Sequence, residues 1–470
     1  MDKKINQTNK IHLNKIQVIV TICAIFILCL FAWRVFILLN FPFPHDYSEA
    51  SILQATILWQ TNGILYSPFE QMPMVHIAYP PLFMSLLYYI DKPENILLVG
   101  RFISLLGTVV CVLIIYLNGQ LKYKSLAFGF SVLWLSMPEI YRMGVMLRVD
   151  MAALACLGLS IFFYEKKKHF LVVLFLSLAI LFKHSAIVLP VLLLYRQIFK
   201  EEKVWFKIIY LIPLLVLGTL FFGQRGDHIF YYHLLEEDFS RFTPLFVDLS
   251  KHGFILLLFC LFCAIKIERK YLLWSISSFV LACLMFSKPG SELIYGMECL
   301  FALILGMRKS GTPENKVVIA CTLLIAGLFI NLPLPKAKVM SRVYANTSAP
   351  ASSKGSTPDE NDYENAKNFM NVLKSTEGRI LSENPAWTNL SGHQPEISPF
   401  QLKHLSKKSV VSEAPIINHI QNHTYAIVIS EGHLDETENR YFSESIRSEV
   451  LRHYTLNQVF GNQYIYIPNR

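Results

Sequence analysis

The feature that most constrains this chain is a series of apolar runs, several of them close to twenty residues long. The first, residues 16–39, is preceded by four lysines and followed by no small-residue cleavage site. A helix of about twenty apolar residues can cross the hydrocarbon core of a bilayer. A cleaved signal peptide has a shorter apolar segment. We therefore predict a retained first span with the N-terminus in the cytoplasm.

Ten further runs follow the first and predict a mostly α-helical, polytopic membrane protein of about 11 transmembrane helices. They are 96–117, 125–141, 151–164, 170–182, 185–198, 204–222, 254–265, 271–286, 292–307 and 317–332. The composition agrees, since 53% of the residues are hydrophobic and only 16% are charged. An ordinary soluble domain has about 25% charged residues. The composition also excludes coiled coils, collagen and disordered chains.

The basic residues decide how the short apolar piece 79–90 is placed. If this piece does not cross the bilayer, five basic clusters fall on the same side as the N-terminus; if it crosses, all five fall outside. The clusters are Lys122/Lys124, Lys166–Lys168, Arg196/Lys200/Lys203, Lys266/Arg269/Lys270 and Arg308/Lys309/Lys316. Cytoplasmic connections carry an excess of Lys and Arg. We therefore predict a juxtamembrane or re-entrant helix at 79–90 within the first outer loop, 41–95.

The chain changes character after residue 335, which divides it into a membrane part, 1–335, and a tail. Residues 336–360 are rich in Ser, Ala, Pro and Lys and predict a flexible linker. Residues 361–470 predict a small extracytoplasmic α/β domain with a helix near 363–374, strands from 378 and at 425–430, and a hairpin of 458–460 with 464–467. The tail carries equal numbers of basic and acidic residues, so the net charge of +9 belongs to the membrane part. This distribution argues against a nucleic-acid partner.

All nine cysteines lie in apolar runs, where they predict buried small side chains and no disulfide framework. Histidines of the predicted outer side make no compact pair of metal ligands. They are His45, His76, His228, His233 and His252. The acidic segment 227–238 could bind a divalent ion or be a solvated loop. No cofactor is predicted with certainty, and no metal ligand is assigned.

Charged residues at the outer ends of the predicted spans are the candidate functional residues. In the first outer loop these are Asp46 and Glu49. In later connections they include Arg148, Asp150, Lys183, His184, Lys288 and Glu298. Ionisable groups at such positions cost free energy unless they are hydrated, paired or used. A phosphate at the outer leaflet would satisfy the cations, and pairing with nearby carboxylates is the alternative.

The order of these pieces resembles the bacterial GT-C glycosyltransferases, the superfamily of protein O-mannosyltransferases and lipid A aminoarabinose transferases. The resemblance covers most of the chain. It rests on His45-Asp46-Tyr-Ser-Glu49, Tyr79-Pro-Pro-Leu, Arg101-Phe-Ile-Ser, Arg148-Val-Asp150-Met, Phe182-Lys183-His184-Ser, Lys288-Pro-Gly-Ser with Tyr295 and Glu298, and Ile380-Leu-Ser-Glu-Asn-Pro in the tail. The acidic loop of this family commonly has two adjacent acids, whereas here Asp46 and Glu49 are separated by two residues.

The resemblance implies a GT-C-like enzyme of the inner membrane. Such an enzyme takes a sugar from a polyprenyl-phosphate carrier and passes it, with inversion, to an extracytoplasmic glycan, lipid or protein acceptor. Asp46 would be the general base for the acceptor hydroxyl. The cations would stabilise the departing phosphate. The expected substrate-binding residues are Glu49, His76, Arg148, Asp150, Lys183, His184, Lys288, Tyr295 and Glu298.

Two other classes of protein fit the apolar runs. A transporter or flippase of an amphipathic envelope lipid should have inverted halves with interrupted helices near the midplane. The sequence shows no such symmetry, and its ionisable residues cluster at one face. A membrane scaffold that only displays the tail would not need Asp46, Arg148 and Lys183 beside the bilayer. The chain has no P-loop and no dinucleotide-binding fingerprint either.

Overall fold

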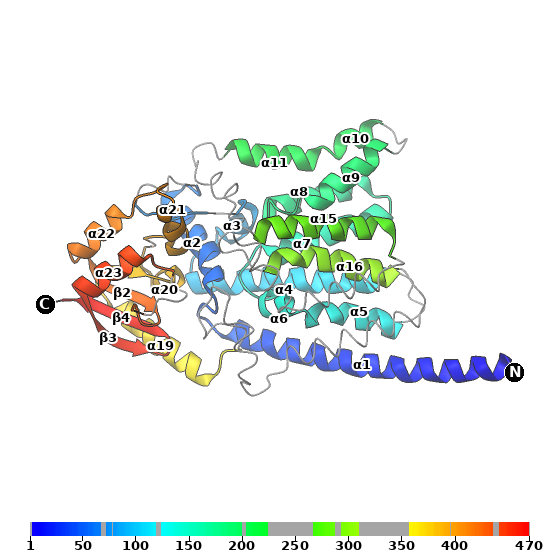
Figure 1. Cartoon of the computed structure of the whole chain (residues 1–470), viewed down its shortest axis with the longest axis horizontal. Coiled ribbons are helices and arrows are strands. Elements are labelled where there is room, and N and C mark those ends of the chain that lie inside the picture. The colour runs from blue at the N-terminus through cyan, green and yellow to red at the C-terminus, as the bar shows by residue number, and fades with distance from the viewer. Residues whose placement is uncertain are drawn as a thin grey trace.

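The described residues form a helical bundle joined to a region with a four-stranded sheet (Figure 1). The computed structural model describes residues 2–66, 72–77, 79–118, 124–199, 204–223, 267–286, 293–309, 357–394, 396–435 and 441–469. The helices run along the long axis of the molecule, and the N-terminus and the sheet lie at opposite ends. The predicted class, mostly helical with a small α/β part, agrees with this arrangement.

The bundle helices correspond closely to the apolar runs. Their bounds are α1 Asp2–Asn40, α4 Pro93–Leu117, α5 Lys124–Ser136, α6 Pro138–Met143, α7 Asp150–Glu165, α8 His169–Phe182, α9 Val188–Phe199, α10 Val204–Ile209, α11 Ile212–Gly223, α15 Arg269–Phe286 and α16 Met297–Lys309. Pro138 divides the predicted run 125–141 and Pro213 lies just after the break in 204–222, because proline cannot continue a helix from the residue before it. The runs 254–265 and 317–332 lie outside the described residues.

Among the described helices, two are long and apolar enough to cross a membrane, residues 17–40 of α1 and the whole of α4. The count of eleven spans therefore stays a prediction. The outer surface of the bundle nevertheless exposes large apolar side chains, among them Ile22, Phe36, Leu106, Leu113, Phe170, Tyr195, Leu215 and Val280. Soluble monomers rarely expose contiguous apolar patches larger than a few hundred Å². A surface of this kind is expected where helices contact lipid.

The first outer loop folds into two helices between the bundle and the sheet, α2 (Tyr47–Asn62) and α3 (Leu82–Leu87). Asp46 is the N-cap of α2, where its side chain accepts the backbone N–H of Ser48. The helix ends at Gly63, whose positive φ of 69° suits a residue without a side chain. Six residues are too few to cross a bilayer, so α3 agrees with a segment that stays on one side.

The tail forms a sheet of strand order β1-β2-β4-β3, in which β1 is parallel to β2 and the other pairs are antiparallel. The strands are β1 Arg379–Ser382, β2 Tyr425–Glu431, β3 Tyr454–Phe460 and β4 Gln463–Pro468. The helices are α19 Glu360–Ser375, α20 Pro385–Leu390, α21 Pro399–Lys407, α22 Ala414–Gln421 and α23 Glu444–His453. The helix near 363–374, the two strands and the hairpin expected from the sequence are all present. We call residues 357–469 the sheet region.

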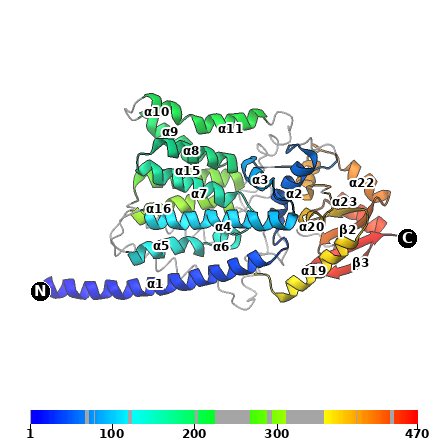
Figure 2. The same ribbon diagram turned by 180° about the vertical axis from the view of Figure 1, so that it is seen from behind.

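The sheet region contacts the first outer loop, not only its own core. Figure 2 shows α20 and α2 between the end of α4 and the strands. Met74 pairs with Ile397 in a parallel bridge. The amide nitrogen of Gln54 donates to the carbonyl of Ile397 at 2.8 Å. The ring of Phe43 stacks on Trp387 with centroids 5.9 Å apart. The outer loop is therefore held between the bundle and the sheet region.

Candidate functional site

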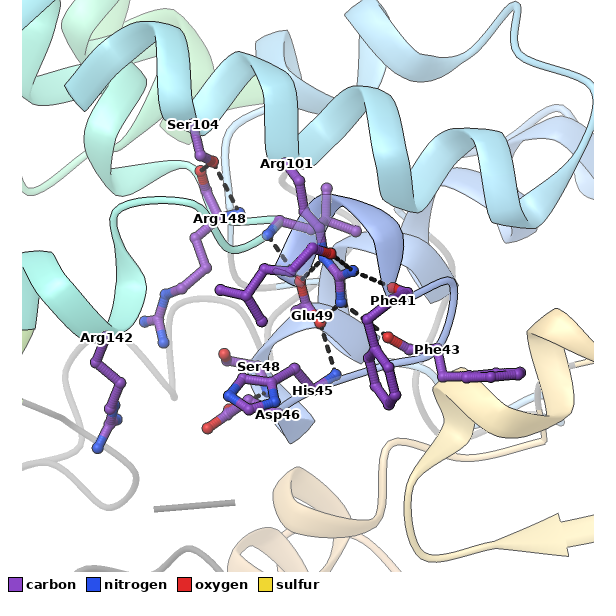
Figure 3. A network of polar contacts seen from close by, with 12 residues as sticks. Phe41, Phe43, His45, Asp46, Ser48, Glu49, Arg101, Ser104, Arg142 and Arg148 are labelled. Carbon is purple, nitrogen blue, oxygen red and sulfur yellow. Dashed lines mark hydrogen bonds and ion pairs between the residues drawn. The ribbon is translucent and has the colours of Figure 1, made fainter. Parts of the chain in front are cut away.

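A buried ion pair fixes the acidic loop against α4 (Figure 3). Arg101 donates from Nε and Nη2 to the two carboxylate oxygens of Glu49, at 2.8 and 2.7 Å. The remaining donors of Arg101 bind the carbonyls of Leu38, Phe41 and Phe43 at 2.5–2.8 Å. The guanidinium therefore gathers the end of α1 and the start of the outer loop around one buried charge.

Glu49 is completely buried, and its oxygens also accept the backbone N–H groups of His45 and Leu147. Burial alone would raise the pKa of Glu49, but the adjacent Arg101 and these hydrogen bonds hold it below its ordinary value. Glu49 was expected to contact substrate. Its burial and its four hydrogen bonds instead fit a residue that positions the loop.

Arg101 belongs to the motif Arg101-Phe-Ile-Ser, but it is not among the site residues that the sequence predicts. The sequence does indicate that Arg101 is unusual, because it lies five residues inside the apolar run 96–117. An unpaired cation there would cost free energy. Such a residue needs an anionic partner. The partner, Glu49, is 52 residues away in the sequence, so its identity required the fold.

Asp46 lies on the side of the loop that faces Arg142 and Arg148 (Figure 3). The side chain is only 7% exposed, and one oxygen accepts the N–H of Ser48 at 2.8 Å. Burial alone would raise the pKa of Asp46, but Arg142, the Ser48 hydrogen bonds and Arg148 hold it below its usual range. Both guanidinium groups lie on the side toward which the Asp46 carboxylate points (Figure 3), and their charge favours its ionised form.

His45 precedes Asp46 and is kept uncharged by its surroundings. Burial, followed by the positive charge of Arg34, lowers the pKa of His45 to about 3. Its Nε2 atom is buried with no hydrogen-bond partner among the described residues. At neutral pH the positive charge beside Asp46 therefore comes from the arginines and not from this imidazole.

A second charged group joins the ends of α7 and α8. Asp150, the first residue of α7, accepts Arg148 Nε at 3.0 Å and Lys183 Nζ at 2.5 Å. The Lys183 ammonium also lies 4.1 Å from the centre of the Tyr295 ring. Arg148 thus connects the two charged groups, since it pairs with Asp150 and influences Asp46. The structure brings together four of the predicted residues: Arg148, Asp150, Lys183 and Tyr295.

Asp150, Lys183 and Tyr295 of this group form the polar end of a cavity. Its walls are mainly apolar and come from α7 and α15. The lining residues are Asp150, Ala153, Leu154, Leu157, Lys183, Ser185, Ala186, Ser278, Leu281, Ala282, Tyr295, Met297 and Glu298. Glu298 accepts the indole N–H of Trp274 at 2.6 Å and the Ser278 hydroxyl at 3.0 Å. The Lys183 ammonium beside apolar walls suits an amphipathic anion.

The other predicted residues are placed differently. His76 is 4% exposed, and its backbone N–H donates to the hydroxyl of Ser398 in the sheet region. His184 is half-buried in the turn after Lys183. Lys288 and the acidic segment 227–238 lie outside the described residues. Within the described part of the chain, no group of three or more His, Cys, Asp or Glu residues could hold a metal ion.

Comparison with known proteins identifies the fold. No family model and no curated protein matches the chain. Two solved structures of ArnT from Cupriavidus metallidurans match it, one bound to undecaprenyl phosphate and one in the apo state. In each case the TM-score is 0.52, the identity is 11%, and the match covers 93% of this chain and 97% of ArnT. The chain therefore has the fold of ArnT, and the predicted resemblance is confirmed at the level of the fold.

Proposed function

We propose that this chain is a membrane glycosyltransferase that moves a sugar from a polyprenyl-phosphate donor to an extracytoplasmic acceptor. The observation that carries the proposal is the buried Asp46 carboxylate, which faces Arg142 and Arg148. The ArnT fold supports this function, as does the undecaprenyl phosphate bound to ArnT itself.

The reaction we propose is a single displacement at the anomeric carbon of the sugar. Asp46 accepts the proton of the acceptor hydroxyl while the acceptor oxygen forms the new bond to that carbon. The bond from the anomeric carbon to the phosphate oxygen breaks, and its electron pair leaves with the lipid phosphate. The configuration is inverted, because the acceptor attacks the face opposite the leaving group. The sugar passes through an oxocarbenium-like state.

Cations at the site stabilise the charge that develops on the departing phosphate. Arg148 and Lys183 are held in place by their ion pairs with Asp150. The apolar walls of the cavity suit the hydrocarbon chain of the donor. Asp150 is thus proposed to orient the cations, while Tyr295 and Glu298 line the same cavity.

The orientation we propose follows from the distribution of charge. The N-terminus lies in the cytoplasm, and the site and the sheet region lie outside. Residues 1–335 would then form the membrane domain and residues 361–470 an extracytoplasmic domain. The linker proposed between them, 336–360, lies mostly outside the described residues.

Asp46→Asn tests the function directly. The amide keeps the shape of the side chain but cannot accept the proton, so we expect transfer to fall by roughly 10²–10⁴-fold. The measurement is consumption of a labelled polyprenyl-phosphate sugar by envelope membranes that contain the protein. Asp91→Asn is the matched control, because Asp91 is an exposed acid of the same outer loop.

The outcomes separate the proposed function from its alternatives. Normal transfer by Asp46→Asn would remove this residue as the base. If the wild-type protein consumed no donor but moved the intact lipid across the bilayer of proteoliposomes, the transporter would replace the enzyme.

A further inference from the structure

The side chain next to Asp46 is held by the sheet region. The ring of Tyr47 stacks on that of Tyr441, with centroids 4.1 Å apart and planes 18° from parallel. Phe400 lies beside the same ring, with a centroid separation of 6.5 Å. The Tyr47 hydroxyl accepts the backbone N–H of Phe400 at 3.3 Å. We call Tyr47, Phe400 and Tyr441 the aromatic clamp.

A buried carboxylate fixes Tyr441 in this clamp. Glu383 is completely buried just after β1. Its oxygens accept the backbone N–H groups of Tyr441 and Phe442 at 2.6 and 3.1 Å, and that of Glu431 at 2.9 Å. One side chain therefore ties the end of β1 to the end of β2 and to the clamp. The backbone of Tyr441 is therefore anchored within the sheet region, and its ring extends from there to Tyr47.

The loop that carries Asp46 consequently has two anchors of different origin. On the bundle side, Glu49 is bound by Arg101. On the sheet side, Tyr47 is bound by Tyr441 and Phe400. Asp46 is the N-cap immediately before Tyr47, so a rotation of the first turn of α2 would move its carboxylate relative to Arg142 and Arg148.

We propose that Tyr441 and Phe400 are positioning residues through which the sheet region aims the Asp46 carboxylate at the acceptor. This inference rests on the proposed function and adds a role for the sheet region in the chemical step. A misplacement of about 1 Å in a catalytic group can reduce the rate by about 10²-fold. The clamp shares no residue with the lining of the cavity beside Lys183. Its loss is therefore expected to leave donor binding intact.

The test compares Tyr441→Leu with Tyr441→Phe. Leucine removes the stacked ring, and we expect kcat to fall by roughly 10- to 100-fold, while KM for a polyprenyl-phosphate sugar changes less than about twofold. Phenylalanine keeps the ring and should retain nearly the full rate. The double variant Tyr47→Leu/Tyr441→Leu should lose no more kcat than the more impaired of the two single variants. The reason is that the effects of substitutions at two contacting residues are not additive.

Ile416→Ala controls for a general loss of stability. Ile416 is completely buried in the core of the sheet region, on α22, which lies away from the bundle in Figure 1. At a comparable fall in melting temperature this control should keep its kcat. Phe400→Leu is the second clamp variant, with Tyr441 left in place, and should lower kcat in the same way.

Three results would overturn the clamp. The first is an unchanged kcat in Tyr441→Leu or, if that variant does not fold, in Phe400→Leu. The second is an equal loss of kcat in Ile416→Ala. The third is a loss of kcat in the double variant that equals the sum of the two single losses in activation free energy. Each of these presumes that the wild type transfers sugar and that Asp46→Asn does not. Failure of that premise would reject the proposed function, whereas normal transfer by folded clamp variants would reject the clamp alone.

Discussion

At the scale of single residues, two carboxylates three positions apart have opposite surroundings. Glu49 is enclosed by Arg101 and backbone N–H groups, so its charge holds the loop to the bundle. Asp46 accepts the backbone N–H of Ser48 and faces Arg142 and Arg148. The surroundings of Glu49 fit a structural role, and we propose Asp46 as the group that takes a proton.

Glu49→Gln is expected to destabilise the protein. The amide leaves Arg101 as a buried charge without its counterion, and breaking a buried ion pair in this way costs about 3–5 kcal/mol. Thermal unfolding of the detergent-solubilised protein measures the effect. Glu94→Gln is the control, because Glu94 and Lys374 form an exposed pair at 3.4 Å, a type worth about 0–1 kcal/mol. Equal melting temperatures for the two variants would contradict a structural role for Glu49.

The pH dependence of transfer should report the charge beside Asp46. Burial raises the pKa of Asp46, and Arg142 outweighs this together with the Ser48 hydrogen bonds and Arg148, so the net pKa lies below its ordinary value. A base with a lowered pKa stays ionised, and therefore active, as the pH falls until that pKa is reached. Arg142→Gln should raise the pKa and move the acidic limb of the rate profile to higher pH.

Arg142→Lys keeps the positive charge and serves as the control for this shift. Its acidic limb should stay close to that of the wild type. If the acidic limb of the rate profile did not move in Arg142→Gln, a group other than Arg142 would control the ionisation of the base.

At the scale of elements, the start of α7 and the end of α8 together assemble the polar end of the cavity. Asp150 is the first residue of α7, where the partial positive charge of the helix favours an acid. It binds Arg148, which lies just before α7, and Lys183, which lies just after α8. The helices α7 and α8 are antiparallel and pack extensively against each other. The Tyr295 ring, in the short turn before α16, covers the Lys183 ammonium. Three separate elements thus place one cation beside the apolar walls.

Lys183→Gln is expected to weaken use of the donor. Removing the ammonium takes away a charge at the polar end of the cavity, and a charge-assisted contact is worth about 1.5–3 kcal/mol. We therefore expect the KM for a polyprenyl-phosphate sugar to rise by roughly 10- to 100-fold. The control is Lys92→Gln, an exposed lysine of the outer loop. An unchanged KM for the donor would contradict a role in donor binding and would leave Lys183 with a structural role, its ion pair with Asp150.

At the scale of the whole molecule, the described basic loops gather at the end of the bundle away from the sheet. Glu165, the last residue of α7, binds Lys270 at the start of α15 and also contacts Lys309 at the end of α16. The hydroxyl of Tyr271 donates to the same carboxylate at 2.5 Å. Asp150, at the other end of α7, belongs to the candidate site. The basic residues and the site therefore lie at opposite ends of one helix, as the positive-inside rule predicts for a spanning protein.

Cysteine labelling tests this orientation. We expect Asn422→Cys, an exposed position in the sheet region, to react with a membrane-impermeant maleimide on intact cells. Lys168→Cys, an exposed position between α7 and α8, should react only after the membrane is permeabilised. The native cysteines lie in apolar runs and set the background through the unsubstituted protein. The reverse pattern would overturn the topology and place the site in the cytoplasm.

The sequence by itself determined the helices of the bundle, the strands of the tail and the loop that carries the candidate base. Apolar runs, proline breaks and alternating strands are local patterns, and local backbone preference with local burial produces them. Only the tertiary structure decided which charges meet. Glu49 pairs with Arg101, Arg148 and Lys183 share Asp150, and Tyr47 stacks on a ring 394 positions later. The packing of helices and sheet determines these partners. A buried charge or polar group is stable only if it meets a partner across the interface, and that partner can lie far away in the sequence.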